Sequence, residues 1–154
     1  MSVKLSLRVD QQKLISTWLN DGATPVALAF WWNRRMRVVD ASGALVAAGP
    51  GTVLPCGVPE DWTELAPGAS FEREESLACT QPAGGPQNVG WSYEHLPAGT
   101  YRVTLLFKTP PEHGFSQSPP NPNAFSGALE SNTVEFAFAP PEKPRGLLSR
   151  LFGK

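Results

Sequence analysis

Histidine and cysteine are scarce in this chain, which holds two of each among 154 residues. His95 and His113 lie in turn-like and proline-rich sequence, and neither is accompanied by the nucleophile and orienting group that catalysis would need. Cys56 and Cys79 fit no metal-binding spacing such as C-x-x-C. We therefore expect no metal, no cofactor and no catalytic residues, and we predict that the protein is not an enzyme.

Paired carboxylates and phosphate-binding loops are missing as well. Glu74 and Glu75 are neighbours on a predicted strand, so their carboxylates point to opposite faces and cannot act on one substrate. Gly84 and Gly85 lack the strand–glycine–helix context of a phosphate-binding loop. Nothing in the sequence implies a small-molecule substrate.

The two cysteines leave two alternatives open. If "APG" at residues 66–68 is the tip of a hairpin, Cys56 lies opposite residue 78, next to Cys79, and a disulfide is within reach. The other alternative is a pair of buried thiols in a reducing compartment, and this is the interpretation that we favour.

Long hydrophobic runs and a signal peptide are also absent. No apolar run approaches the roughly 20 residues that a membrane-spanning helix needs. The chain begins Met1-Ser2-Val3-Lys4-Leu5 and enters an alternating pattern at once, which leaves no room for a signal peptide. These features favour the cytoplasm.

Charge is unevenly distributed, although the net charge is only −1. Residues 142–154 carry four basic side chains and one acidic side chain, Glu142, which gives this segment a net charge of +3. The remaining 9 of 13 basic and 13 of 14 acidic side chains lie in residues 1–141, which therefore carry a net charge of −4. An acidic body repels nucleic acid at long range. The segment FWWNRRMR (30–37) combines tryptophan and arginine, as grooves that bind single-stranded nucleic acid do. Strand alternation also accounts for this composition, because it places one tryptophan in the core and the other on the outer face, beneath the aliphatic parts of the arginine side chains. We expect no nucleic-acid binding.

Alternation of apolar and polar residues with a period of two dominates the sequence and predicts short strands. Turns rich in glycine and proline separate these strands, among them "ASG" at 41–43, which is typical of an antiparallel β-sandwich. The charged run 69–79 is predicted at a sheet edge, where charge discourages edge-to-edge pairing. The predicted strands are 3–9, 13–20, 26–32, 35–40, 44–48, 69–78, 100–107 and 131–138, with Tyr101, Val103, Leu105, Val134 and Phe136 in the core.

Four segments show a resemblance to known proteins: "NDGATPVALAF" (20–30), "RVVDASGALV" (37–46), "LAPGASFE" (65–72) and "LPAGTYRV" (96–103). Their order resembles that of bacterial immunoglobulin-like domains, including the intracellular proteinase inhibitor family. The resemblance implies an all-β chain with one antiparallel sandwich of immunoglobulin-like or fibronectin-III-like type over residues 1–139. It also implies a bacterial source, and it makes proteinase inhibition the second candidate function.

The long segment 109–127 and the C-terminal residues depart from the inhibitor pattern. Five prolines between Pro110 and Pro122 stiffen this segment toward an extended conformation, and such long loops are often functional. Phe115 and Phe125 are either exposed anchors for a partner or residues that pin the loop onto the sandwich. An inhibitor would act through this loop.

Residues 140–154 form a proline-rich spacer and a basic amphipathic tail. On a helix with about 100° per residue, the apolar side chains of the tail fall within an arc of about 140°, and its last two cations lie at about 300° and 340°. A helix this short is unstable alone in water, so an anionic membrane or a groove on a partner protein must stabilise it; packing on its own sandwich is the remaining alternative. We predict a non-catalytic binding or adaptor module, cytoplasmic or peripheral on the inner membrane face, that docks through Leu147, Leu148, Arg150, Leu151, Phe152 and Lys154.

Overall fold

A computed structural model describes residues 2–30, 34–50, 53–54, 62–79, 81–82, 91–109 and 121–139. In these ranges the chain forms strands and loops, so the predicted all-β class is confirmed, and none of them contains a helix of the length and apolarity that crossing a membrane requires. The strands are β1 (Val3–Asp10), β2 (Lys13–Asn20), β3 (Val26–Leu28), β4 (Arg34–Val39), β5 (Gly49–Pro50), β6 (Val53–Leu54), β7 (Thr63–Leu65), β8 (Ser70–Glu75), β9 (Ala78–Cys79), β10 (Gln81–Pro82), β11 (Trp91–Ser92), β12 (Gly99–Thr109), β13 (Gly127–Glu130) and β14 (Val134–Phe138).

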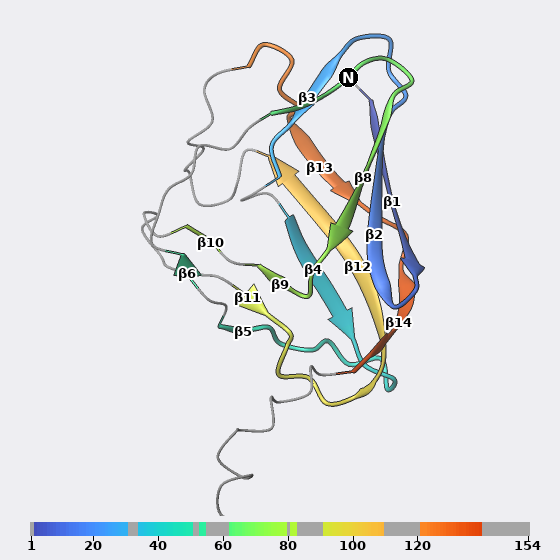
Figure 1. The fold of residues 1–154 in the computed structure, drawn as a ribbon, viewed down its shortest axis with the longest axis vertical. Helices are drawn as coiled ribbons and strands as arrows, with labels where there is room; N and C mark the ends of the chain where they lie inside the picture. Colours follow the sequence, from blue (N-terminus) through green and yellow to red (C-terminus); the bar gives the residue numbers. More distant parts are fainter. Residues whose placement is uncertain are drawn as a thin grey trace, which may run out of the picture.

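Two antiparallel sheets carry the core (Figure 1). The first has the order β1-β2-β8. In the second, β12 is central, with β4 along one side and β13 and β14 one after the other along the opposite side. One cluster of buried side chains draws on both sheets, an arrangement consistent with a β-sandwich. Shorter pairings join β3 to β7, β11 to β5 and β9, and β6 to β10.

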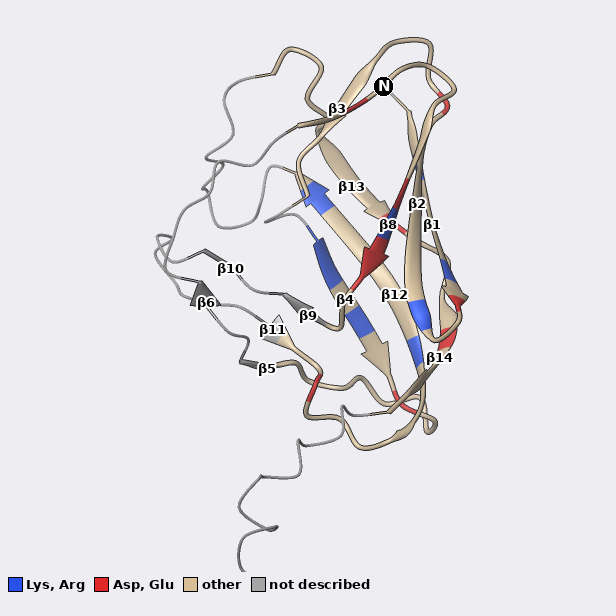
Figure 2. Cartoon of the chain, in the orientation of Figure 1, with Lys and Arg blue, Asp and Glu red and all other residues tan. Residues whose placement is uncertain are grey.

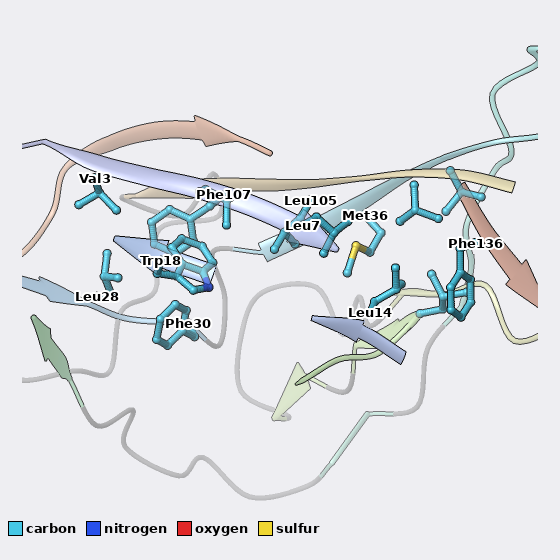
Figure 3. Packing of buried hydrophobic residues seen from close by; sticks show 14 of the residues in the cluster. Val3, Leu7, Leu14, Trp18, Leu28, Phe30, Met36, Leu105, Phe107 and Phe136 are labelled. Carbon is cyan, nitrogen blue, oxygen red and sulfur yellow. The ribbon is translucent and has the colours of Figure 1, made fainter. Parts of the chain in front are cut away.

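The core is built around Trp18 of β2, which is fully buried (Figure 3). Its ring lies edge-on to the rings of Phe30 and Phe107, with 4.9 Å between centroids in both pairs. The indole N–H donates a hydrogen bond to Ser16 Oγ at 2.9 Å, so the one polar group of this side chain is satisfied. Aromatic side chains from β2, from β12 and from the residues after β3 thereby join the two sheets.

The first two strands match the prediction most closely. Strands were expected at 3–9 and 13–20, and β1 and β2 occupy these positions, paired along their full length. In β1 the alternate apolar residues are buried as far as Leu7. The two strands are joined through Gln11 and Gln12, whose φ angles of 46° and 66° are the left-handed values that a two-residue type I′ turn requires.

The predicted core face of β12 and β14 is also confirmed. Tyr101 lies near the start of β12, and its hydroxyl donates a hydrogen bond to the carbonyl of Pro97 at 3.0 Å, four residues upstream. Of the five core residues expected in these strands, Val134 is half-buried and packs against the core, and the others are buried: Tyr101, Val103, Leu105 and Phe136.

The predicted strands 26–32 and 44–48 are cut short in the structure. Strand 26–32 is shorter than expected, because β3 ends at Leu28; residues 31 and 32 lie outside the described residues. The strand expected at 44–48 is reduced to a short return along β4: Leu45 bridges to Val39 and the N–H of Val46 donates to the carbonyl of Val38 at 2.9 Å, while the side chain of Leu45 remains 70% exposed. The turn expected at 41–43 does form: the side chain of Asp40 accepts hydrogen bonds from the backbone N–H groups of Ser42 and Ala44, and the N–H of Asp40 donates to the carbonyl of Ala44 at 3.0 Å.

The condition for a disulfide between the cysteines, a hairpin with its tip at residues 66–68, is not met. The turn itself forms, with Gly68 at a φ of 76°, but β7 before it pairs with β3 and β8 after it pairs with β2. The register that would set Cys56 opposite residue 78 therefore has no basis. Cys56 lies outside the described residues, so the disulfide stays untested.

The strand expected at 131–138 begins later, at Val134, and the structure adds β13 before it. Between the two strands, Ser131 Oγ accepts the backbone N–H of Leu105 at 2.9 Å, and the hydroxyls of Thr133 and Thr104 lie 2.8 Å apart. These side-chain contacts with β12 replace part of the backbone ladder and separate β13 from β14.

Candidate functional site

A groove of about 600 Å³ runs along β1 on the side where β13 lies. One of its walls consists of residues 3–6 of β1 together with Thr17 and Leu19 of β2. Leu129, Glu130 and Asn132 form the other wall. We call this feature the edge groove. Its volume is within the range of pockets that hold ligands.

The backbone of β1 opens toward this groove. In an antiparallel pair, alternate residues direct both their N–H and their C=O toward the neighbouring strand. The N–H of Asp21 donates to the carbonyl of Ser2 at 3.1 Å, so Ser2 and every second residue after it face β2. Val3 and Leu5 consequently direct their backbone groups away from β2, and they have no hydrogen-bond partner for them within the described part of the chain.

Asn132 closes the same edge one position further along. Its side-chain Oδ1 accepts the N–H of Leu7 at 2.8 Å, and its Nδ2 donates to the carbonyl of Leu7 at 2.9 Å. These are the two hydrogen bonds that a neighbouring antiparallel strand would exchange with Leu7. The edge of β1 is therefore satisfied at Leu7 and open at Val3 and Leu5.

The second wall of the edge groove is also a strand edge. The N–H of Ser131 donates to the carbonyl of Leu105 at 3.0 Å, so by the same alternation Leu129 faces β12. Ala128 and Glu130 direct their backbone groups the other way, toward the side of β13 on which no strand of the described residues pairs with it. The groove is thus bordered by two edges with unsatisfied backbone groups.

Both charged side chains at the groove already have partners. The Lys4 ammonium lies 2.6 Å from the Asp21 carboxylate, and this contact, followed by a hydrogen bond from Ser2, holds the pKa of Asp21 below its usual value. Glu130 forms an ion pair with Arg37. Strong local charge lies elsewhere, with basic residues along β4 and acidic ones along β8 (Figure 2).

A second polar arrangement is buried between the sheets. Arg34 of β4 forms an ion pair with Glu75 of β8, whose side chain is 2% exposed. Ser16 Oγ donates to Glu75 at 2.6 Å, and Arg34 Nε donates to the carbonyl of Phe30 at 2.8 Å. Glu74 points outward and pairs with Lys13, which confirms that the two neighbouring carboxylates face opposite ways. Because this network is enclosed and internally satisfied, we assign it to stability.

The site residues predicted from the sequence fall mostly outside the described residues. All six tail positions, Phe115, and His113 lie there. Phe125 is described and is buried in the core, with its ring 6.0 Å from that of Phe107. Of the two alternatives for Phe125, the structure therefore matches the one in which it pins the loop onto the sandwich. His95 is exposed, and no group of three metal-binding side chains occurs among the described residues.

The edge groove was missed by sequence reasoning. Its key residue, Asn132, stands in the polar stretch "SNT" (131–133), at the start of the strand that the sequence predicts over 131–138. Neither the models of known protein families nor the curated proteins give a match to this chain.

Proposed function

We propose that this protein is a non-catalytic binding module that holds a partner protein in the edge groove. The observation that carries the proposal is the pair of unsatisfied strand edges on either side of an apolar hollow of about 600 Å³. A buried or paired edge is the usual arrangement, since open edges recruit other chains. A sandwich that leaves a short edge open beside a hollow is suited to recognition.

An immunoglobulin-like type of sandwich is part of this proposal. A three-stranded sheet, β1-β2-β8, faces a sheet formed by β4, β12 and the two C-terminal strands, as the A-B-E and C-F-G strands do in that fold. The hydroxyl of Tyr101, near the start of β12, bonds to the backbone upstream, which is the geometry of the tyrosine corner. Both features support the type, and domains of this architecture commonly serve in binding.

A photo-crosslinking experiment tests the proposed function. A benzophenone amino acid at Ser6, an exposed residue of the groove, should give a discrete crosslinked species when the full chain is expressed in its native cells. The same amino acid at Ala98, exposed in the loop before β12, should not. Equal crosslinking at both positions, or none at Ser6, would contradict a binding function of the groove.

The tail adds a second attachment point to the proposal. On a helix, its four apolar side chains would lie on one face and its last two cations on another. A helix this short is not stable alone, so this pattern supports docking on an anionic membrane or in a groove of a partner protein. We expect Leu148→Asp with Phe152→Asp to abolish sedimentation with phosphatidylserine vesicles and to leave the melting temperature of the sandwich unchanged.

Charge reversal separates the two surfaces on which the tail would dock. Arg150→Glu with Lys154→Glu should weaken vesicle binding in step with the anionic lipid content, because each basic residue contributes about 1 kcal/mol near such a surface. If vesicles never bind and the double aspartate variant melts several degrees lower, the tail packs on its own sandwich and the docking proposal is wrong.

Proteinase inhibition through the segment 109–127 is the second candidate. The observation that favours it is the anchoring of the end of this segment on β3. The N–H of Ala27 donates to the carbonyl of Asn123 at 2.8 Å, and the N–H of Phe125 donates to the carbonyl of Ala27 at 2.9 Å. Anchoring this end lowers the conformational entropy that the segment would lose on binding. Tight inhibition of a proteinase at equimolar dose would favour this candidate over the edge groove.

A further inference from the structure

We propose that the edge groove takes an extended segment of a different protein, which adds to β1 as a further strand. This inference rests on the proposed function, because it states what kind of partner the binding module holds. One juxtaposition supports it. Val3 and Leu5 of β1, whose outward backbone groups are open, lie beside Leu7, whose backbone groups are already bonded by the side-chain amide of Asn132.

The chemistry at Leu7 indicates what fills the rest of the groove. A carboxamide has the same donor and acceptor as a peptide group, and the amide of Asn132 bonds to both the N–H and the carbonyl of Leu7. Leu5 and Val3 offer the same pair of groups at the next two outward positions of the strand. A peptide backbone that continues from the position of Asn132 would therefore satisfy them in the same way, with about four hydrogen bonds.

Asn132 also limits the length of the added strand. Because Leu7 is already paired, a peptide can bond to β1 only at Leu5 and Val3, where the groove is lined by residues 3–6. Main-chain hydrogen bonds would supply affinity and side chains would supply specificity, as in other cases of strand addition. Leu19 and Leu129 offer apolar contacts to alternate side chains of the peptide.

A second copy of this chain does not suit the groove. The antiparallel register that uses both open residues pairs Val3 with Leu5 of the other copy, and it sets Lys4 directly opposite the other Lys4. Like charges at directly opposite positions are destabilising. The same geometry favours a different partner with an acidic side chain opposite Lys4, whose side chain is mostly exposed beside Asp21 and can contact a second carboxylate.

The C-terminal tail of the chain is also a poor occupant. Its apolar residues, Leu147, Leu148, Leu151 and Phe152, are spaced for one face of a helix. A strand added to β1 needs apolar residues at every second position instead. The proposal is therefore confined to a segment of another protein.

A methylation scan of a bound peptide tests the backbone pairing. The probe is an eight-residue peptide selected from a displayed random library for binding to the full chain. Single N-methyl groups are then placed at each of its positions. We expect losses of affinity of tenfold or more at every second position in the groove, where the N–H groups face β1. Effects between these positions should be small, because the proposal pairs the peptide with β1 and not with the open edge of β13.

Two substitutions at one residue provide the matched test on the protein. Val3→Pro removes an N–H that has no partner, and proline is tolerated on a sheet edge at such positions. It should lower peptide affinity at least tenfold more than Val3→Ala, which shortens the side chain and keeps the N–H. The peptide should also slow amide hydrogen exchange at Val3 and Leu5 and leave it unchanged at Lys4 and Ser6, which already pair with β2.

The outcomes separate the two proposals. If Ser6 crosslinks a partner but no peptide is selected, the methylation scan shows no alternation, or the proline and alanine variants bind alike, strand addition is wrong and a binding function stands. If Ser6 crosslinks nothing, the binding function itself is wrong. A dimer in sedimentation that Val3→Pro abolishes would show that the occupant is a second copy, and would overturn the assignment to a different protein.

Discussion

Arg34→Met should lower the free energy of unfolding by about 3–5 kcal/mol, because removing one partner of a buried ion pair leaves the other charge uncompensated. The carboxylate of Glu75 is 2% exposed and would keep only the hydroxyl of Ser16 as a donor. The lost pair also joins β4 to β8, one strand from each sheet. Urea denaturation followed by circular dichroism measures the change.

Two further variants serve as controls for Arg34→Met. Lys13→Met removes the partner of the neighbouring Glu74 on the exposed face of β8 and should change stability by less than about 1 kcal/mol. The double variant Arg34→Met with Glu75→Leu should recover most of the loss, since replacing a buried pair with apolar residues is often neutral or stabilising. A single Arg34→Met variant as stable as the original protein would mean that the pair is hydrated rather than buried.

Trp18→Ala should destabilise the protein by a comparable amount, about 3–5 kcal/mol, as a large-to-small change in a packed core. The ring is fully buried and touches Phe30 and Phe107 edge-on, so its removal opens a cavity between the sheets. It also leaves Ser16 without the donor that the indole provides. Equilibrium unfolding in urea, with the slope compared between variants, checks the loss.

Thr17→Ala is the matched control for Trp18→Ala. Thr17 is the preceding residue of β2, is half-buried and bonds to Glu72 on the outer face at 3.2 Å. Its removal should change stability by about 0.5 kcal/mol or less. Similar losses at the two positions would mean that the core does not centre on Trp18.

The strands were predictable where alternation is strict and local. β1 alternates apolar and polar residues from Val3 to Asp10, and β12 does so from Tyr101 to Leu105, where the side that faces the core was identified from that pattern. An error arose where a side chain competes with the backbone ladder. The strand predicted over 131–138 begins only at Val134, because the hydroxyl of Ser131 takes the place of a backbone acceptor for the N–H of Leu105. Composition alone does not reveal such competition.

The candidate site was less predictable than the fold. Sequence reasoning selected the segments that a core does not explain, the tail and the segment 109–127, and most of their residues lie outside the described ranges. The edge groove depends on which strands are neighbours. Asn132 is separated from Leu7 by 125 residues, and no local pattern indicates that its amide will meet that strand. Pairing over such distances is fixed by the tertiary fold.

The order of the strands also has a consequence for synthesis. Val39 of β4 lies opposite Arg102 of β12, which the ribosome adds 63 residues later. At translation rates of about 5–20 residues per second, the synthesis of β4 precedes that of its partner β12 by roughly 3–13 s. During that interval the edge of β4 that later pairs with β12 is open to other nascent chains. The charges of Arg34, Arg35 and Arg37 discourage such contacts, so the basic character of β4 protects the chain before it stabilises the sandwich.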